Sequence, residues 1–378
     1  MPDEVIERFR KIYRANLNVR PGERVLVFTD TVAEGEKTDA AGLLRRKGLL
    51  KLARAAEKAS RELGFETFYL EFPALGSHGS EPGEDLWRLA FGDDTVRALG
   101  KKGLLGRIRS KTASKEDIRE AKEIVSAAKS SAAAVVIALS NYSTSHTRFR
   151  DILTSVAGAR YASMPLFEED MLFGSMEADW DKVAARSRRI ADAIDGADSV
   201  RVTTPAGTDI TFGISGRRPM IDTGILHEPG SFSNLPAGEV YLAPVEGTGE
   251  GSLTLLWAPN RKLETPVTVK VHDGMAADVE GDEPFAREFR EALDRASGNR
   301  NLAELGIGTN DRATKPDNVL ESEKIFGTIH LAFGDNSSFG GTVSAPFHQD
   351  FVFFSPTLRV SRSGGGDTII MDSGRLQI

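Results

Sequence analysis

Residues 115–140 read KEDIREAKEIVSAAKSSAAAVVIALS, and they are the clearest indication of how the amino-terminal half of the chain folds. Residues 115–130 have the apolar spacing of an amphipathic helix, whereas AAAVVIALS (132–140) is the most strand-like run of this half. A short strand that is apolar along its whole length is typical of a sheet covered on both faces. The stretch therefore predicts a helix that leads into a buried strand.

The same alternation of helix and strand extends through the first half of the sequence. RVLVFTD (24–30) and ETFYLEF (66–72) are further strand candidates, and the helical pattern between them ends on Gly64. ADWDKVAARSRRIADAIDGA (178–197) has the pattern of one more amphipathic helix. Strands that alternate with helices in this way predict an open, mostly parallel α/β layer.

The character of the sequence changes after residue 197, where we place a domain boundary. A chain of 378 residues is too long for one ordinary hydrophobic core, so about two domains are expected. From residue 198 onward there are short alternating strand patterns, such as VRVTTPAGTDITFGIS (200–215), and one clear helix at 283–296. We therefore predict an amino-terminal α/β domain over residues 1–197 and a β-rich α+β domain over residues 198–378.

The composition excludes several classes of protein. The chain has 48 lysine and arginine residues against 55 aspartate and glutamate residues and no long basic block, which argues against nucleic acid as a partner. It has no cysteine, which excludes disulfides, thiolate metal sites and thiol catalysis and favours a cytoplasmic location. No run approaches the ~18 apolar residues of a membrane span, and the amino terminus lacks the apolar core of a signal peptide, so no membrane partner is expected.

The stretch SAPFHQDFVFF (344–354) places a histidine and a carboxylate inside an otherwise apolar strand pattern. Groups that carry charge do not occupy such a place without partners. His348 and Asp350 are two positions apart, and residues i and i+2 of a strand lie on the same face of a sheet. The two side chains can therefore reach one metal ion or two adjacent ions.

Three further residues lie in similar surroundings in the second half of the chain. His330 lies in a strand-like run just before a glycine-rich turn, and Glu239 and Glu304 are bracketed by apolar residues and by Gly, Asn or Pro. A single histidine in an apolar strand is more often a hydrogen-bonded core residue, and a single glutamate at a strand edge is usually solvated. The spacing alone therefore indicates a candidate metal site and leaves its chemistry open.

Taken together, these motifs resemble the metallo-aminopeptidase family of aminopeptidase T and aminopeptidase S, the thermophilic type of leucyl aminopeptidase. The resemblance covers most of the chain, and the order and spacing of its short motifs are more specific than any one of them. The motifs are LNVRPGERVLVFTD (17–30), STSHTRFRDILTSVAGARYASMP (143–165), NLPAGEVYLAPVEG (234–247), NLAELGIGTN (301–310), TIHLAFGDN (328–336) and VSAPFHQDF (343–351).

The resemblance implies a centre of two divalent metal ions in the carboxyl-terminal domain. The residues that match the family's ligands are Glu239, Glu304, His330, His348 and Asp350. Histidine and carboxylate ligands suit zinc, cobalt, manganese or iron, so the identity of the metal stays open, with zinc, cobalt and manganese expected first. The family's fold, an amino-terminal α/β domain and a metal-binding carboxyl-terminal domain in a homodimer, agrees with the predicted boundary.

The activity that this resemblance implies is that of a metal-dependent aminopeptidase. The two ions would activate a water molecule that removes amino-terminal residues from small peptides, and Glu239 or Glu304 would accept the proton from that water. One position departs from the family pattern. Its peptidases usually carry a tyrosine seven residues after the matching histidine, and this chain has Ser337 there.

Two alternatives remain open from the same residues. His330, His348 and Asp350 form a set of two histidines and one carboxylate, which is typical of non-haem iron oxygenases. The scaffold also resembles that of a ring-opening dihydroxypyridine dioxygenase, and this interpretation predicts one iron ion with Glu239 or Glu304 too distant to be a ligand. The third interpretation is a non-catalytic dimeric protein that keeps its metal ions for stability.

Overall fold

The computed structural model describes residues 2–378, and they form two compact units with mixed α/β structure. The first unit comprises the chain up to Met176 together with Gly224–Leu235, and the second comprises Glu177–Thr223 and Pro236–Ile378. The chain thus leaves the first unit, returns to it for a short segment, and leaves it again. The single boundary between residues 197 and 198 stays a prediction.

The first unit is built on a five-stranded sheet in the order β2-β1-β3-β4-β8, in which all neighbouring strands are parallel. Its strands are β1 (Arg24–Thr31), β2 (Glu66–Pro73), β3 (Val135–Ala138), β4 (Arg160–Ser163) and β8 (Phe232–Asn234). The predicted strand within 132–140 is β3, and all of its residues are buried. The helix expected before it is α6 (Lys115–Ala127), which begins with a capping box between Ser114 and Asp117.

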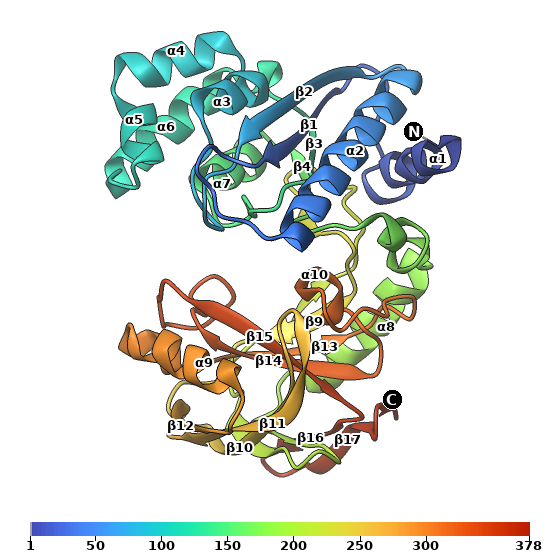
Figure 1. Ribbon diagram of the computed structural model, residues 1–378, viewed down its shortest axis with the longest axis vertical. Coiled ribbons are helices and arrows are strands. Elements are labelled where there is room, and N and C mark those ends of the chain that lie inside the picture. Colours follow the sequence, from blue (N-terminus) through green and yellow to red (C-terminus); the bar gives the residue numbers. More distant parts are fainter. Residues whose placement is uncertain (1) are drawn as a thin grey trace. The chain divides into compact units, whose positions relative to one another are not determined.

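Helices surround this sheet, and Figure 1 shows α2 running alongside β1 and β2. Besides α6, the helical segments are α1 (Asp3–Lys11), η1 (Ile12–Asn16), α2 (Ala40–Glu62), α3 (Glu84–Phe91), α4 (Asp93–Lys101), α5 (Leu104–Arg109), η2 (Lys129–Ser131), α7 (Arg148–Ser155), η3 (Glu169–Leu172) and η4 (Ser175–Glu177). Within residues 2–378, no helix combines the length and the apolar character needed to cross a membrane.

The second unit contains two sheets and few helices. An eight-stranded sheet has the order β12-β11-β10-β6-β5-β16-β17-β18, and a five-stranded sheet has the order β15-β14-β13-β9-β7. The strands are β5 (Ser199–Thr203), β6 (Asp209–Gly213), β7 (Met220–Asp222), β9 (Glu239–Leu242), β10 (Glu250–Ala258), β11 (Arg261–His272), β12 (Met275–Glu280), β13 (Leu302–Gly308), β14 (Thr328–Gly334), β15 (His348–Phe354), β16 (Thr357–Arg362), β17 (Gly366–Asp372) and β18 (Arg375–Leu376). The helices are α8 (Trp180–Ile194), α9 (Pro284–Asp294), η5 (Ser297–Arg300) and α10 (Val319–Ser322).

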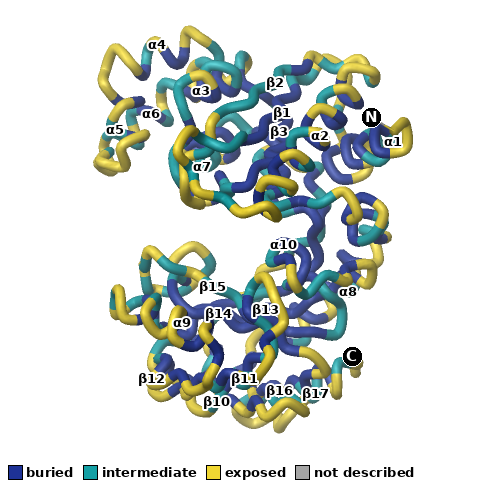
Figure 2. The backbone as a smooth tube through the Cα atoms, viewed as in Figure 1, coloured by how far each residue is buried: buried dark blue, intermediate teal, exposed yellow. Residues whose placement is uncertain are grey.

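One face of the five-stranded sheet packs into the hydrophobic core of the second unit. Leu305, Leu331 and Phe351 are cross-strand partners on β13, β14 and β15, and all three are buried in this core. Helix α9 packs against the same side, where the ring of Phe289 lies 5.0 Å from that of Phe351. Figure 2 shows β13 and β14 as buried along their length. Because side chains alternate between the faces of a strand, the remaining residues of these strands point to the opposite face.

Candidate metal centre

The register of the strands gathers the predicted site residues on that opposite face. Ala332 of β14 pairs with Asp350 of β15 and with Glu304 of β13. Two positions away along β14, His330 pairs with Gly306. Cross-strand partners share a face, and so do residues i and i+2, so Glu304, His330 and Asp350 point to the same side.

The other two predicted residues join this face from strands β15 and β9. His348 is the first residue of β15 and lies two positions before Asp350. Glu239 is the first residue of β9 and pairs with Gly308, two positions after Gly306. The structure thus brings all five sequence-predicted residues to one surface of the sheet.

The charged and imidazole groups of these residues lie close together. His330 Nε2 lies 3.4 Å from Glu304 Oε1 and 3.6 Å from Glu239 Oε2, and His348 Nε2 lies 3.3 Å from Glu304 Oε2 and 3.5 Å from Asp350 Oδ2. Glu304, His330 and Asp350 each offer one ligand atom, and these atoms lie within 4.8 Å of one another. The iron-dependent alternative expected a glutamate too distant to be a ligand, and Glu304 does not meet that expectation.

A glycine opposite His330 makes room for the imidazole ring. A Cβ atom on Gly306 would lie 1.9 Å from His330 Nε2, far inside van der Waals contact. Glycine is therefore required at this strand position for His330 to lie across β13. The sequence interpretation missed this role, although the glycines of NLAELGIGTN alternate along the same face as Glu304.

His348 is held in one orientation by the backbone. Its Nδ1 donates a hydrogen bond to the Asp335 carbonyl oxygen at 2.7 Å, because a carbonyl can only accept. The other ring nitrogen, Nε2, faces Glu304 and Asp350, whose charges raise the pKa of His348, and it can bind a metal ion once it gives up its proton. The exposed fraction of the His348 side chain is 30%, against 1% for His330, so the centre is open to solvent at β15.

Lys324 is a charged residue of the centre that the sequence interpretation did not find. It follows α10 and is completely buried, with its Nζ 2.8 Å from Glu239 Oε1 and 2.7 Å from Glu323 Oε2. Nothing in the local pattern ESEKIFGTIH marks it, because it lies outside a regular strand or helix and its partner Glu239 is distant in sequence.

These residues fit a divalent transition-metal ion. Three carboxylates, those of Glu239, Glu304 and Asp350, face two imidazoles, and mixed nitrogen and oxygen ligands of this kind suit iron, zinc, cobalt or manganese. Among residues 2–378, buried Glu239 Oε2 and His330 Nδ1 lack a hydrogen-bond partner. Buried polar atoms without a partner are rare in folded proteins. A bound ion or substrate would give Glu239 Oε2 a partner.

Without an ion, protons supply part of the positive charge of the centre. Burial lowers the pKa of His330, but its hydrogen bond with Glu304 and the charge of Glu239 outweigh burial and raise this pKa to about 9. Burial raises the pKa of Glu239 to about 7, against the opposing effect of the Lys324 charge. A metal ion would displace such protons, because ligands bind in their deprotonated forms.

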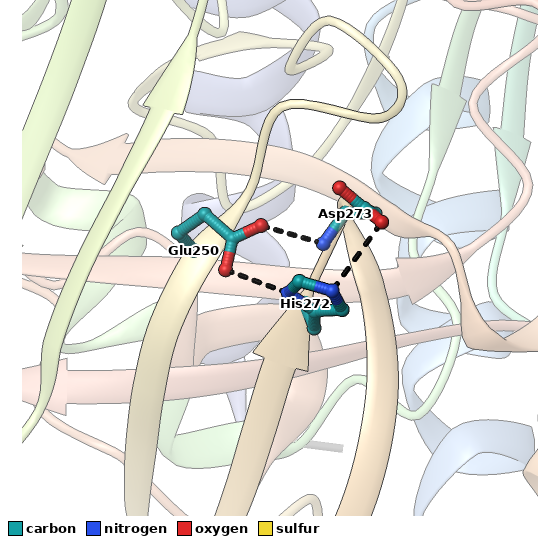
Figure 3. Close-up of side chains that lie close together, drawn as sticks. All are labelled: Glu250, His272 and Asp273. Carbon is teal, nitrogen blue, oxygen red and sulfur yellow. Dashed lines mark hydrogen bonds and ion pairs between the residues drawn. The ribbon is translucent and has the colours of Figure 1, made fainter.

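Figure 3 shows a second group of potential ligands, Glu250, His272 and Asp273, and all three residues are exposed. His272 Nδ1 lies 3.0 Å from Glu250 Oε2, and its Nε2 lies 3.4 Å from Asp273 Oδ2. Glu250 also accepts a hydrogen bond from the Asp273 backbone amide at 2.9 Å. These contacts close the turn between β11 and β12, and exposed ion pairs of this kind contribute little and need no metal. We do not count this group as the functional centre.

Ser337 provides no substitute for the tyrosine of the aminopeptidases. It is exposed, and its hydroxyl donates to the Asp335 carboxylate at 3.0 Å. The serine hydroxyl is therefore committed to the turn that follows β14.

Comparisons with known proteins place the chain in a family. A family model described as 2,5-dihydroxypyridine 5,6-dioxygenase, NicX, matches residues 4–377. The structure is similar to that of 2,5-dihydroxypyridine dioxygenase from Pseudomonas putida KT2440, with a TM-score of 0.68 and 17% identity over 98% of this chain and 96% of that chain. It is also similar to wild-type AmpT from Thermus thermophilus, with a TM-score of 0.57 and 15% identity over 100% of this chain and 99% of that chain. No curated protein sequence matches the chain.

These findings correct the aminopeptidase interpretation. The family model that spans the chain is that of a dioxygenase, so the assignments as a hydrolase, a metallopeptidase and a protease, and that of a peptide as the substrate, are wrong. The physical reason is that motifs such as TIHLAFGDN and VSAPFHQDF form strands β14 and β15 of a scaffold that both solved structures share. The motifs indicate the scaffold and leave the reaction open. The chain belongs to the NicX family, that of 2,5-dihydroxypyridine 5,6-dioxygenase.

Proposed function

We propose that the chain is a ring-cleaving dioxygenase that holds one iron ion with His330, His348 and Asp350. The observation that carries this proposal is the convergence of these side chains from β14 and β15 on one face of a sheet, in a chain of the NicX family. Two histidines and one carboxylate are the ligand set of many non-haem iron oxygenases. A single iron ion takes the place of the two zinc, cobalt or manganese ions expected from the aminopeptidase resemblance.

The iron ion, when bound, supplies the one-electron chemistry through which dioxygen can react with an aromatic ring. Asp335 holds His348 through its carbonyl, and Gly306 gives His330 the space to lie across β13. The hydrogen bond to His348 and the space beside His330 set the positions of the two imidazoles before an ion binds, so the ligands need little rearrangement when it does.

In this proposal Glu239 and Glu304 exchange protons with the substrate and with the histidines. Glu239 Oε2 has no hydrogen-bond partner within residues 2–378, and it lies 3.6 Å from His330 Nε2. With a pKa raised by burial to about 7, this carboxylate can accept the proton of a ring hydroxyl near neutral pH. Glu304 lies between the two histidines, with its oxygens 3.4 and 3.3 Å from their Nε2 atoms, and it accepts hydrogen bonds from them only while those nitrogens carry protons, before an ion takes their place.

The substrate class that fits is a small aromatic ring that bears hydroxyl groups, with 2,5-dihydroxypyridine as the first compound to test. One carbon–carbon bond of the ring breaks, and both atoms of one dioxygen molecule enter the product, so no external reductant is needed. We further propose that the carboxyl-terminal domain predicted over residues 198–378 carries the chemistry and that the domain over residues 1–197 supports it. The homodimer and the cytoplasmic location stay predictions.

Oxygen uptake with labelled dioxygen tests this function directly. Protein freed of metal and loaded with iron(II) without air would be mixed with 2,5-dihydroxypyridine and isotopically labelled dioxygen. We expect one dioxygen to be consumed for each ring, with both labelled atoms in a ring-opened product, and we expect no uptake by His348→Ala. Full iron occupancy without oxygen uptake on any dihydroxypyridine would refute the proposal, and so would a product that carries one labelled atom.

A further inference from the structure

Lys324 places a buried positive charge beside the metal-binding face. Its Nζ lies 2.8 Å from Glu239 Oε1 and 2.7 Å from Glu323 Oε2, and the side chain has an exposed fraction of 0%. The backbone of Lys324 is also fixed, because its amide donates to the Glu321 carbonyl and its carbonyl accepts from the Asn310 amide. The ammonium group is therefore held in one place rather than carried on a mobile side chain.

The carboxylates of this region carry more negative charge than one divalent ion can balance. Glu304 and Asp350 lie at the histidines, and Glu239 and Glu323 lie at Lys324. Asp222 is the cross-strand partner of Glu239 on β7 and adds a further negative charge nearby. Buried carboxylates need a counter-charge, and a divalent ion at the histidines does not supply the one that Glu239 and Glu323 require; Lys324 does.

We propose that Lys324 is a built-in cation that limits the centre to one metal ion, which rests on the single-iron centre proposed above. The ammonium binds Glu239 and Glu323 together, in the position from which a second ion would bind them. Lysine suits this role because its ammonium is a compact point charge. Glu239 is thereby left with one oxygen, Oε2, directed at His330 and available to the substrate.

A purely structural ion pair predicts something different. If Lys324 only stabilised the fold, its removal would lower the melting temperature and leave the number of bound ions at one. If it takes the place of an ion, its removal frees two buried carboxylates that together attract another cation. Metal stoichiometry therefore separates the two roles.

The test is a metal count on Lys324→Met, which removes the charge and keeps much of the length of the side chain. Metal-free wild-type protein and the variant would be dialysed to equilibrium against manganese(II) and analysed for metal and by electron paramagnetic resonance. We expect one isolated ion in the wild type and two ions with an exchange-broadened spectrum in the variant. One ion in the folded variant, or two in the wild type, would overturn the proposal.

Three further variants keep the outcome decisive. Lys324→Arg retains the charge and should bind one ion, whereas Lys324→Met combined with Glu239→Gln should lose the added ion and return to one. If Lys324→Met does not fold, as judged by circular dichroism in the presence of manganese, Lys324→Ala is counted instead, and two ions are again expected. The count does not depend on turnover, so a chain that binds one ion but cleaves no ring would refute the proposed function and leave this inference standing.

Discussion

Substitution of Gly306 by alanine should weaken iron binding at least a hundredfold while the fold survives. The added Cβ would lie 1.9 Å from His330 Nε2, and ordinary contact begins at 3.4 Å, so the imidazole must move by about 1.5 Å. Metal ligands tolerate displacements of only about 0.2 Å, so His330 would no longer reach the ion. Removal of a hydrogen-bond partner of a metal ligand already weakens metal binding ~10–100-fold. Displacement of the ligand itself should therefore weaken iron binding at least a hundredfold.

The fold should tolerate this substitution because Gly306 has no left-handed backbone conformation and pairs normally with His330 and Tyr241. Overpacking of this size costs about 1–3 kcal/mol, which lowers the melting temperature by a few degrees in a domain of this size. A matched control is Gly100→Ala on α4, where an added Cβ meets nothing within 4 Å. Iron affinity would be measured without air by competition with a chelator. Wild-type affinity in Gly306→Ala would refute the reasoning that places the ion at His330 Nε2.

Two further predictions concern the loop before β15 and the effect of pH. Asn336→Ala should cost about 1–3 kcal/mol, because the buried amide donates to Glu246 at 3.0 Å and accepts from the Val343 amide at 2.9 Å, and the lost partners stay unpaired. Thermal denaturation checks this, and an unchanged melting temperature would contradict it. In a chelator, stability should fall as pH rises from 6.5 to about 9, because the pKa of His330 is raised from 6.5 to about 9. The charged imidazole stabilises the fold fully below pH 6.5 and loses that effect as pH rises through 9, so a melting temperature that increases over this range would sink the prediction.

The parts of the fold that local pattern controls could be predicted from the sequence. The buried run that forms β3 and the amphipathic helices α6 and α8 follow from the spacing of apolar residues along a single segment. His348 and Asp350 could be predicted to lie on one face because the direction of side chains along a strand repeats every two residues. Each of these inferences depends on neighbours in sequence.

The rest of the centre depends on register between strands that are distant in sequence. Glu239 reaches His330 only because β9 pairs with β13 and β13 pairs with β14. The bulge in the pairing between Leu302 and Glu304 shifts that register and is not visible in the local pattern. The role of Lys324 could not be predicted for the same reason, since its partner Glu239 lies on a strand that is distant in sequence.

The reaction was harder to predict than the site because the same side chains suit two chemistries. Histidines and carboxylates on one sheet face can hold two ions for hydrolysis or one ion for oxygenation, and the motifs of β14 and β15 are equally compatible with both. A two-ion centre and a one-ion centre differ in how much positive charge the carboxylates must obtain from bound ions. In this chain Lys324 already pairs with Glu239 and Glu323 from within, so ions from outside need to supply less positive charge, and Glu239 Oε2 has no hydrogen-bond partner within residues 2–378. Under the proposal that Lys324 limits the centre to one ion, a single buried lysine that no motif contains is what separates this centre from a two-ion hydrolase centre.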